Sequence, residues 1–130
     1  MKMKKLILIL LFSTVMFSSS SYAGWTKIVE GASGNTSYVD FERIREHDGY
    51  VYFWELADYL KPTSTGVLSG KVYSQGDCKL FRSKILSYSF HNEPMGNGIP
   101  ADANNNLDGE WRYPAPNSVY ENVLQSVCNR

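Results

Sequence analysis

The chain of 130 residues contains two cysteines, Cys78 and Cys128, and their chemical state decides what this sequence can fold into. There is no C-x-x-C pair, and neither histidine stands at metal-ligand spacing to either cysteine. Both observations disfavour a redox-active thiol and a metal site. In an oxidising compartment two such cysteines most simply pair with each other, whereas in the cytosol they stay reduced. The compartment must therefore be established first.

The N-terminus has the three parts of a secretory signal peptide. Three lysines lie within the first five residues, a mostly apolar run of twelve residues follows at 6–17, and Ser21 and Ala23 occupy the small-residue cleavage positions. A membrane-spanning helix needs about 20 apolar residues, so this run is too short for an anchor. We expect residues 1–23 to be removed and the rest exported. No cysteine follows the cleavage position, so we expect a periplasmic or secreted protein without a lipid anchor.

The expected mature chain, residues 24–130, has the length of a single domain. Loss of the three N-terminal lysines leaves 10 basic against 13 acidic residues, a formal charge of −3. With no long basic run, the chain lacks the footprint of a nucleic-acid-binding protein, and no later segment is apolar enough to span a membrane. A Cys78–Cys128 disulfide would close a loop of about 50 residues, for which chain entropy gives roughly 4 kcal/mol.

Strand signals dominate the mature chain. Residues 50–60 are rich in aromatic and β-branched side chains and end at Lys61-Pro62, where proline removes a ladder donor. Residues 91–110 have no periodicity and predict a long loop, which in a compact domain is either functional or disordered. The other predicted elements are strands at 25–30, 37–40, 66–75, 78–90 and 111–113, a helical turn at 41–46 and a turn at Gly76-Asp77.

Residues 118–128 give the one good α-helix signal. Ser118 and Glu121 form a capping box, and the apolar residues of the segment, Cys128 included, fall on one face. The helix should lie on a sheet, with a Cys78–Cys128 disulfide tying its last turn to a strand. The sequence therefore predicts an α+β fold, a mainly antiparallel sheet with a C-terminal helix on one face.

An 11-residue helix is about 16 Å long and shields only part of one sheet face. The strand at 50–60 is nevertheless apolar on both sides, with Tyr52 and Trp54 on one and Phe53 and Tyr59 on the other. Exposed apolar patches of this kind usually mark interaction sites. We expect Phe53 and Tyr59 to lie on an uncovered face that binds a partner protein or a second copy of the chain.

Lys79, Arg82 and Lys84 form the densest basic cluster, with Lys71 on the preceding strand. Arg82 and Lys84 share one strand face and could receive an acidic partner or a sulfated sugar. The alternative interpretation is a solvated strand face whose long side chains lie over apolar neighbours.

Catalytic and metal-binding signatures are absent from the sequence. There is no G-x-S-x-G, phosphate-binding glycine loop or H-E-x-x-H, and His91 with Glu93 reads as an ordinary strand-end surface pair. Residues 104–109 resemble the start of a calcium loop, but Ala115 stands where a bidentate glutamate is needed. We expect neither enzymatic activity nor a cofactor nor a metal.

The segments "SGKVYSQGDC", "YSF" and "EPMGNG", followed by a helix that ends in cysteine, resemble the bacterial surface-adhesin protein E family over residues 25–128. The resemblance implies an antiparallel sheet with a C-terminal helix tied back by a disulfide, at positions that match Cys78 and Cys128. It also implies dimers and binding to host extracellular-matrix or plasma proteins such as laminin, vitronectin and plasminogen.

Two functions follow as hypotheses. The first is an exported, non-catalytic adhesin that binds a protein through the uncovered sheet face and the loop at 91–110. The second is a periplasmic structural or accessory protein that uses the same face on a partner in the bacterial envelope. The second stays open because this chain lacks the lipidation cysteine of the family's namesake.

Overall fold

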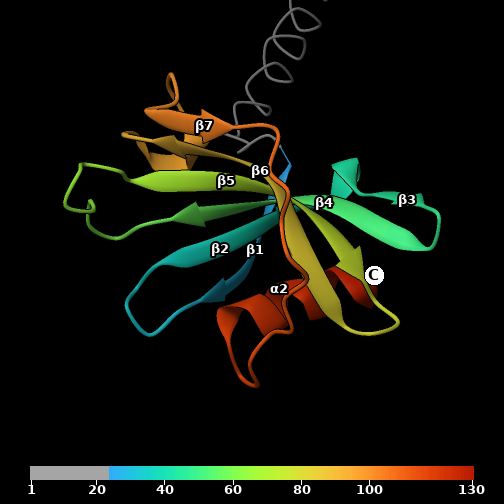
Figure 1. Cartoon of the computed structure of the whole chain (residues 1–130). Helices are drawn as coiled ribbons and strands as arrows, with labels where there is room; N and C mark the ends of the chain where they lie inside the picture. The colour runs from blue at the N-terminus through green and yellow to red at the C-terminus, as the bar shows by residue number, and fades with distance from the viewer. Residues whose placement is uncertain (1–23) are drawn as a thin grey trace, which may run out of the picture.

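Runs of β-branched and aromatic residues fold into strands that pair in one antiparallel sheet (Figure 1). The computed structural model describes residues 24–130, so the predicted signal peptide lies outside the described residues. The sheet has seven strands in the order β1-β2-β4-β5-β6-β7, and β3 pairs with β4 beyond the end of β2. The strands are β1 (Trp25–Glu30), β2 (Thr36–Asp40), β3 (Arg45–His47), β4 (Tyr50–Asp58), β5 (Ser69–Asp77), β6 (Arg82–His91) and β7 (Asp102–Asn104).

Helix α2 (Val119–Cys128) packs on one side of this sheet, below β1, β2 and β4 in Figure 1. The Ser118 hydroxyl accepts a hydrogen bond from the Glu121 amide at 3.1 Å, and the Glu121 carboxylate accepts one from Asn117 at 3.0 Å. Cys128 is joined to Cys78 across a Cα–Cα distance of 5.6 Å, within the usual range for a disulfide. The predicted α+β class and the predicted disulfide are both confirmed.

The helix face of the sheet, defined as the face that α2 covers, holds the main core. Val39, Val51 and Phe53 pack there against Val123, Leu124 and Val127 of α2, all at most 7% exposed. The expectation that Phe53 lies on an uncovered face is wrong, because α2 covers this side of β4. Phe53 is 2% exposed and belongs to the core.

The opposite side of the sheet, the open face, is covered at one end by the chain itself. Leu56 is fully buried there, beside the 3₁₀ turn η3 (Pro94–Gly96). The Asp58 carboxylate accepts a hydrogen bond from the Met95 amide at 2.7 Å and thereby holds this turn on β4. His91 is 2% exposed and lies within hydrogen-bonding distance of Ser89 and Gly98, so the surface interpretation of His91 was wrong.

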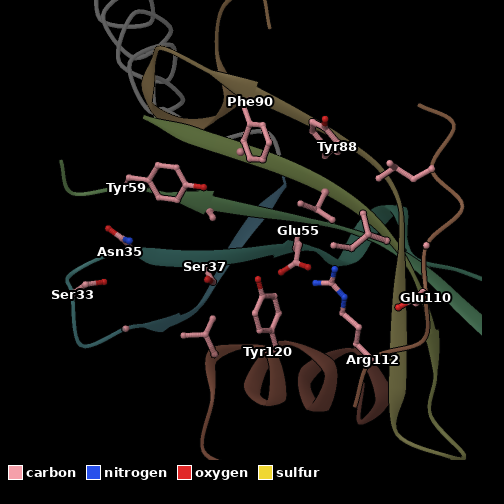
Figure 2. Close-up of a pocket in the computed structure, with 18 of the residues that line it drawn as sticks. Ser33, Asn35, Ser37, Glu55, Tyr59, Tyr88, Phe90, Glu110, Arg112 and Tyr120 are labelled. Atoms are coloured by element: carbon pink, nitrogen blue, oxygen red, sulfur yellow. The ribbon is translucent and has the colours of Figure 1, made fainter. Parts of the chain in front are cut away.

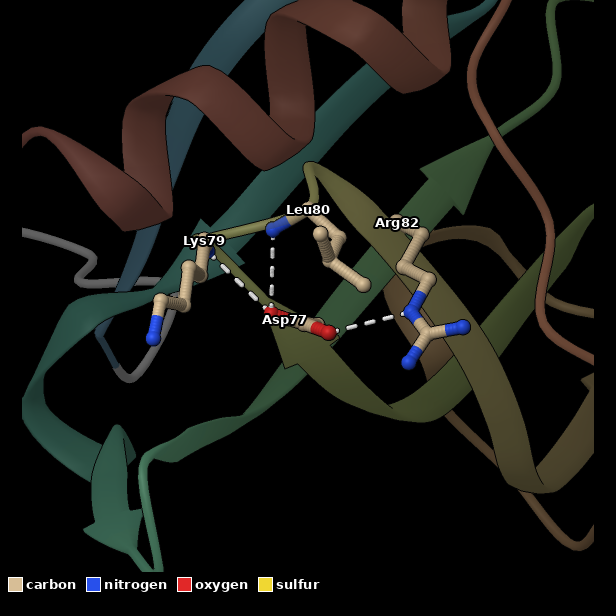
Figure 3. Close-up of polar contacts among 4 residues, drawn as sticks. All are labelled: Asp77, Lys79, Leu80 and Arg82. Atoms are coloured by element: carbon tan, nitrogen blue, oxygen red, sulfur yellow. Dashed lines mark hydrogen bonds and ion pairs between the residues drawn. The ribbon is translucent and has the colours of Figure 1, made fainter.

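The hairpin between β5 and β6 turns later than the sequence predicted. Asp77 stays in the ladder opposite Arg82, and the turn occupies residues 78–81, with Phe81 at φ 53°. One Asp77 oxygen accepts from the amides of Lys79 and Leu80 at 3.1 and 3.2 Å, and the other accepts from the Arg82 guanidinium at 3.0 Å (Figure 3). A carboxylate that satisfies turn amides in this way fixes the turn beyond the Gly-Asp pair.

The long loop predicted at 91–110 contains the turn η3 and the edge strand β7, and the residues that follow β7 lie along the outer edge of β6. After β7, the Leu107 amide donates to the Leu86 carbonyl at 3.1 Å, and Arg112 and Ser83 exchange backbone hydrogen bonds of 2.8 and 3.0 Å. The strand predicted at 111–113 is reduced to this single bridge. The helical turn predicted at 41–46 is a 3₁₀ turn at Phe41–Arg43 followed by β3.

Within residues 24–130, no helix combines the length and apolar character needed to cross a membrane.

Candidate binding surfaces

Three aromatic side chains form a band on the open face. Tyr52 and Trp54 project from β4 on the same side because they are two residues apart, and Tyr73 of β5 is the register partner of Trp54. The ring centroids of Trp54 and Tyr73 are 4.9 Å apart, and those of Tyr52 and Tyr73 are 6.3 Å apart. This aromatic band, Tyr52, Trp54 and Tyr73, stays partly exposed on the face opposite α2.

Two arginines border the aromatic band. The Arg43 guanidinium lies 5.7 Å from the centre of the Trp54 ring, and an Arg45 nitrogen lies 3.5 Å from the Tyr73 hydroxyl oxygen. Arg43 is held at its base by Asp40, whose carboxylate accepts its Nε–H at 2.7 Å. Both arginines are exposed at the surface, so the band presents rings and cations together.

A second cluster gathers around Trp111 on the same face. The Arg82 guanidinium lies 4.2 Å and the Lys84 ammonium 4.6 Å from the centre of the Trp111 ring, and the Tyr50 ring centroid lies 5.7 Å away. The expectation that Arg82 and Lys84 share a strand face is confirmed. Trp111 is placed over them by the backbone bridge between Ser83 and Arg112.

Asp77 fixes Arg82 within this cluster. Burial acts to raise the pKa of the Asp77 carboxyl, but hydrogen bonds from Leu80, Arg82 and Lys79 hold it below its usual range. The pKa of Arg82 is raised, chiefly by its hydrogen bond to Asp77. Lys79 is not part of the cluster, since Figure 3 shows its side chain directed away from Arg82. Of the predicted basic trio, the structure thus brings together two members.

The helix face carries a pocket of about 730 Å³ beyond the N-terminal end of α2. It exists because α2 is too short to cover the whole face, as its length predicted. Apolar side chains from three strands contribute to its wall, namely Ala57, Val72, Ile85 and Phe90. Tyr59, the other predicted contact residue, also lines this pocket and therefore does not lie on the open face. Burial, and then the neighbouring Tyr120, raise the pKa of Tyr59, so its hydroxyl stays protonated.

Glu55 is the central polar group of this pocket. Figure 2 shows its carboxylate directed into the cavity, with the Tyr120 hydroxyl and the Arg112 guanidinium directed toward it. Burial raises the pKa of Glu55 from 4.5 to about 7. In residues 24–130, no side chain forms an ion pair with it. The group stands between neutral and ionised near physiological pH.

The sequence analysis predicted neither the pocket nor the place of Trp111 beside Arg82 and Lys84. Glu55 carried a usable signal, an acidic residue inside the most apolar strand and in phase with Phe53. Trp111 carried none, because the tryptophan follows a loop without periodicity. Among the described residues, no group of three or more His, Cys, Asp or Glu side chains is placed to hold a metal ion.

Comparison with known proteins identifies the fold and the family. Two crystal structures of Haemophilus influenzae protein E match with TM-scores of 0.64 and 0.59, each at 19% sequence identity. The first match covers 85% of this chain and 91% of that one, and the second covers 86% and 79%. A search of curated protein sequences finds no match. The family model "Surface-adhesin protein E" matches residues 25–129, and the chain therefore belongs to the surface-adhesin protein E family.

Proposed function

We propose that this protein is an exported, non-catalytic adhesin that binds another protein through the open face of its sheet. Membership of the surface-adhesin family supports a protein partner and exposure at a surface. The aromatic band is the observation that supports the open face as the binding surface, because Tyr52, Trp54 and Tyr73 lie opposite α2 and stay partly exposed. The predicted contact residue Phe53 has no part in this surface.

The residue types on the open face are those that concentrate binding energy. Tyrosine, tryptophan and arginine dominate interface hot spots, where truncation of one side chain costs about 2 kcal/mol or more. Trp54 and Tyr73 are already held by strand pairing and by the contact between their rings. Little side-chain entropy is therefore left to lose when a partner docks.

The charge of the open face favours a partner with an acidic contact region. Arg43 and Arg45 border the aromatic band, and Arg82 and Lys84 lie against Trp111. Asp40 and Asp77 pair with Arg43 and Arg82, whereas no carboxylate of residues 24–130 forms an ion pair with Arg45 or Lys84. The four cations therefore outnumber the two carboxylates that pair with them. Charges at the rim of such a surface act mainly on the association rate and its salt dependence.

Host proteins of the extracellular matrix or plasma are the partners that we propose, with laminin, vitronectin and plasminogen as the specific candidates. These are the ligands implied by the family resemblance. A protein of the bacterial envelope and a second copy of the chain are the other occupants of the same face. A stable complex with any of these partners would bury roughly 1,200 to 2,000 Å² of surface.

The experiment compares the wild type with a Trp54→Ala/Tyr73→Ala double variant. The mature protein is applied to immobilised laminin, vitronectin and plasminogen, and in parallel to an envelope extract of the source cells. The double variant should lose at least about tenfold in affinity, since two hot-spot side chains are removed. Tyr120→Ala is the matched control, because Tyr120 is an exposed aromatic residue on the other face and should leave binding unchanged.

The outcomes separate the possible partners. Binding to a matrix protein that the double variant loses supports the adhesin proposal. Specific capture of one envelope protein, with no matrix binding, would show that the open face binds an envelope partner, as the accessory hypothesis states. Dimers that dissociate in the double variant assign the face to self-association. Matrix binding that Tyr120→Ala abolishes and the double variant retains would show that the open face is the wrong surface.

A further inference from the structure

The pocket on the helix face is not needed for the proposed adhesion, yet its lining has a definite chemical character. Four of its residues are aromatic, and they come from β6, from α2 and from the position after β4, namely Tyr88, Phe90, Tyr120 and Tyr59. Aromatic faces of this kind attract organic cations, especially where water is partly excluded. A pocket of about 730 Å³ lies within the size range of sites for small molecules.

The charges that line the pocket point to the same class of ligand. Three carboxylates, Glu55, Asp108 and Glu110, stand against the single cation Arg112 among the described lining residues. Asp108 and Glu110 are exposed, whereas Glu55 is only partly exposed and lies between Phe90 and Tyr120 in Figure 2. A concave wall with an excess of one sign raises the local concentration of opposite charge.

The Glu55 carboxylate lacks the partner that a half-buried charge requires. It forms no hydrogen bond or ion pair within the described chain, and Arg112 is not within ion-pair distance of it. Because no buried side-chain oxygen of residues 24–130 lacks a hydrogen-bond partner, the unpaired Glu55 oxygens are those that open into the pocket. A carboxylate that is partly withdrawn from water costs free energy unless a cation or a hydrogen-bond donor compensates it. The lining thus offers aromatic walls and an unpaired anion, and its one cation, Arg112, points toward Glu55 without reaching ion-pair distance.

We propose that this pocket binds an organic cation with an apolar body, an alkyl- or arylammonium group, whose charged nitrogen pairs with Glu55. The apolar body lies on Val72, Ile85 and Phe90, and Tyr120 closes the site from the side of α2. The cation can come from a free small amine or from a lysine side chain that a peptide presents. The site lies on the face opposite the aromatic band and functions independently of it.

Calorimetric titration tests the proposal with two probes at about pH 8, where Glu55 is ionised. Benzyltrimethylammonium represents the free cation, with benzyl alcohol as its neutral counterpart. A capped Phe-Lys dipeptide represents the peptide source, with capped Phe-norleucine as its neutral counterpart. At least one cation should bind with a dissociation constant of about 1 mM or lower and at least about tenfold more tightly than its counterpart. The stronger of the two cations identifies the source.

Glu55→Gln should weaken the cation at least about tenfold while leaving the neutral probe unchanged. Glu55→Asp, which keeps the charge, should retain part of the affinity and guards against a fold defect in the glutamine variant. Affinity should also fall at about pH 5.5, because protonation of Glu55 removes the anion. Tyr59, Tyr88, Asp108, Glu110, Arg112 and Tyr120 are the other titratable groups that line this pocket.

Tyr73→Ala is the control for the opposite face and should bind the cation as the wild type does. The proposal is overturned if neither cation saturates up to about 10 mM. It is equally overturned if the neutral probes bind as well as the cations, or if Glu55→Gln binds the cation unchanged. None of these results bears on the adhesin proposal, which depends on Trp54 and Tyr73.

Discussion

The most direct test of the Glu55 environment is the pH dependence of stability in Glu55→Gln. Glutamine keeps the shape of the side chain and removes its ionisation. Burial raises the pKa of Glu55 from 4.5 to about 7 in the folded protein. The folded state therefore holds the proton more tightly than the unfolded state does, and ionisation opposes folding.

The sign and size of the effect follow from linkage. The stability that the folded state gains by holding the Glu55 proton is fully present below about pH 4.5. It is lost as the pH rises through about 7. Each unit of pKa shift corresponds to about 1.4 kcal/mol, so the full shift would cost roughly 3 kcal/mol in unfolding free energy. Because the carboxylate opens into the pocket, solvent screening reduces the expected loss to roughly 1 to 3 kcal/mol.

Urea denaturation of both proteins at about pH 5 and pH 8 gives the measurement. Between these two pH values the unfolding free energy of the wild type should fall by roughly 1 to 3 kcal/mol more than that of Glu55→Gln. The difference in stability between the two proteins therefore shifts in favour of the variant at the higher pH. Glu110→Gln, an exposed carboxylate that lines the same pocket, should differ from the wild type by less than about 0.5 kcal/mol at both. Equal pH dependence in the wild type and Glu55→Gln would refute the buried-carboxylate reasoning.

Three further predictions concern the cross-link, the edge of the sheet and the N-terminus. Cys78→Ser and Cys128→Ser should each cost about 2 to 5 kcal/mol in unfolding free energy by urea titration, and unequal costs would contradict a shared disulfide. Gly109→Ala places a methyl group against the Ile85 carbonyl. The variant should lower the unfolding free energy by about 1 to 3 kcal/mol and speed hydrogen exchange at the Ser83 and Arg112 amides. Unchanged exchange would contradict the pairing of this segment with β6. The exported protein should begin at Gly24 and carry no lipid by intact mass spectrometry, and a retained leader or an acyl mass would disprove the predicted processing.

Local sequence patterns determined the elements whose causes are local. Ser118 and Glu121 mark the start of α2, and the apolar spacing of residues 119–128 identifies its buried stripe. The aromatic and β-branched content of residues 50–58 specifies β4 in the same way. The disulfide could be predicted as well, because only two cysteines exist in a chain with a predicted export signal.

Only the tertiary structure decided which side of β4 is covered. The alternation of side chains separates Phe53 from Trp54, but both sides are aromatic, so the pattern contains no preference. Packing of α2 on Val39 and Val51 places Phe53 in the core and leaves Trp54 on the open face. That choice depends on contacts between segments about 70 residues apart, which no local propensity encodes.

The pocket and the Trp111 cluster were decided in the same way. Residues 102–112 have no period of their own and are held by hydrogen bonds to the edge of β6, which place Trp111 over Arg82 and bring Arg112 to the pocket. Sequence determined that α2 is too short to cover its face. The fold determined that the uncovered part encloses Glu55, because pocket walls are built from segments that meet only after the sheet has formed.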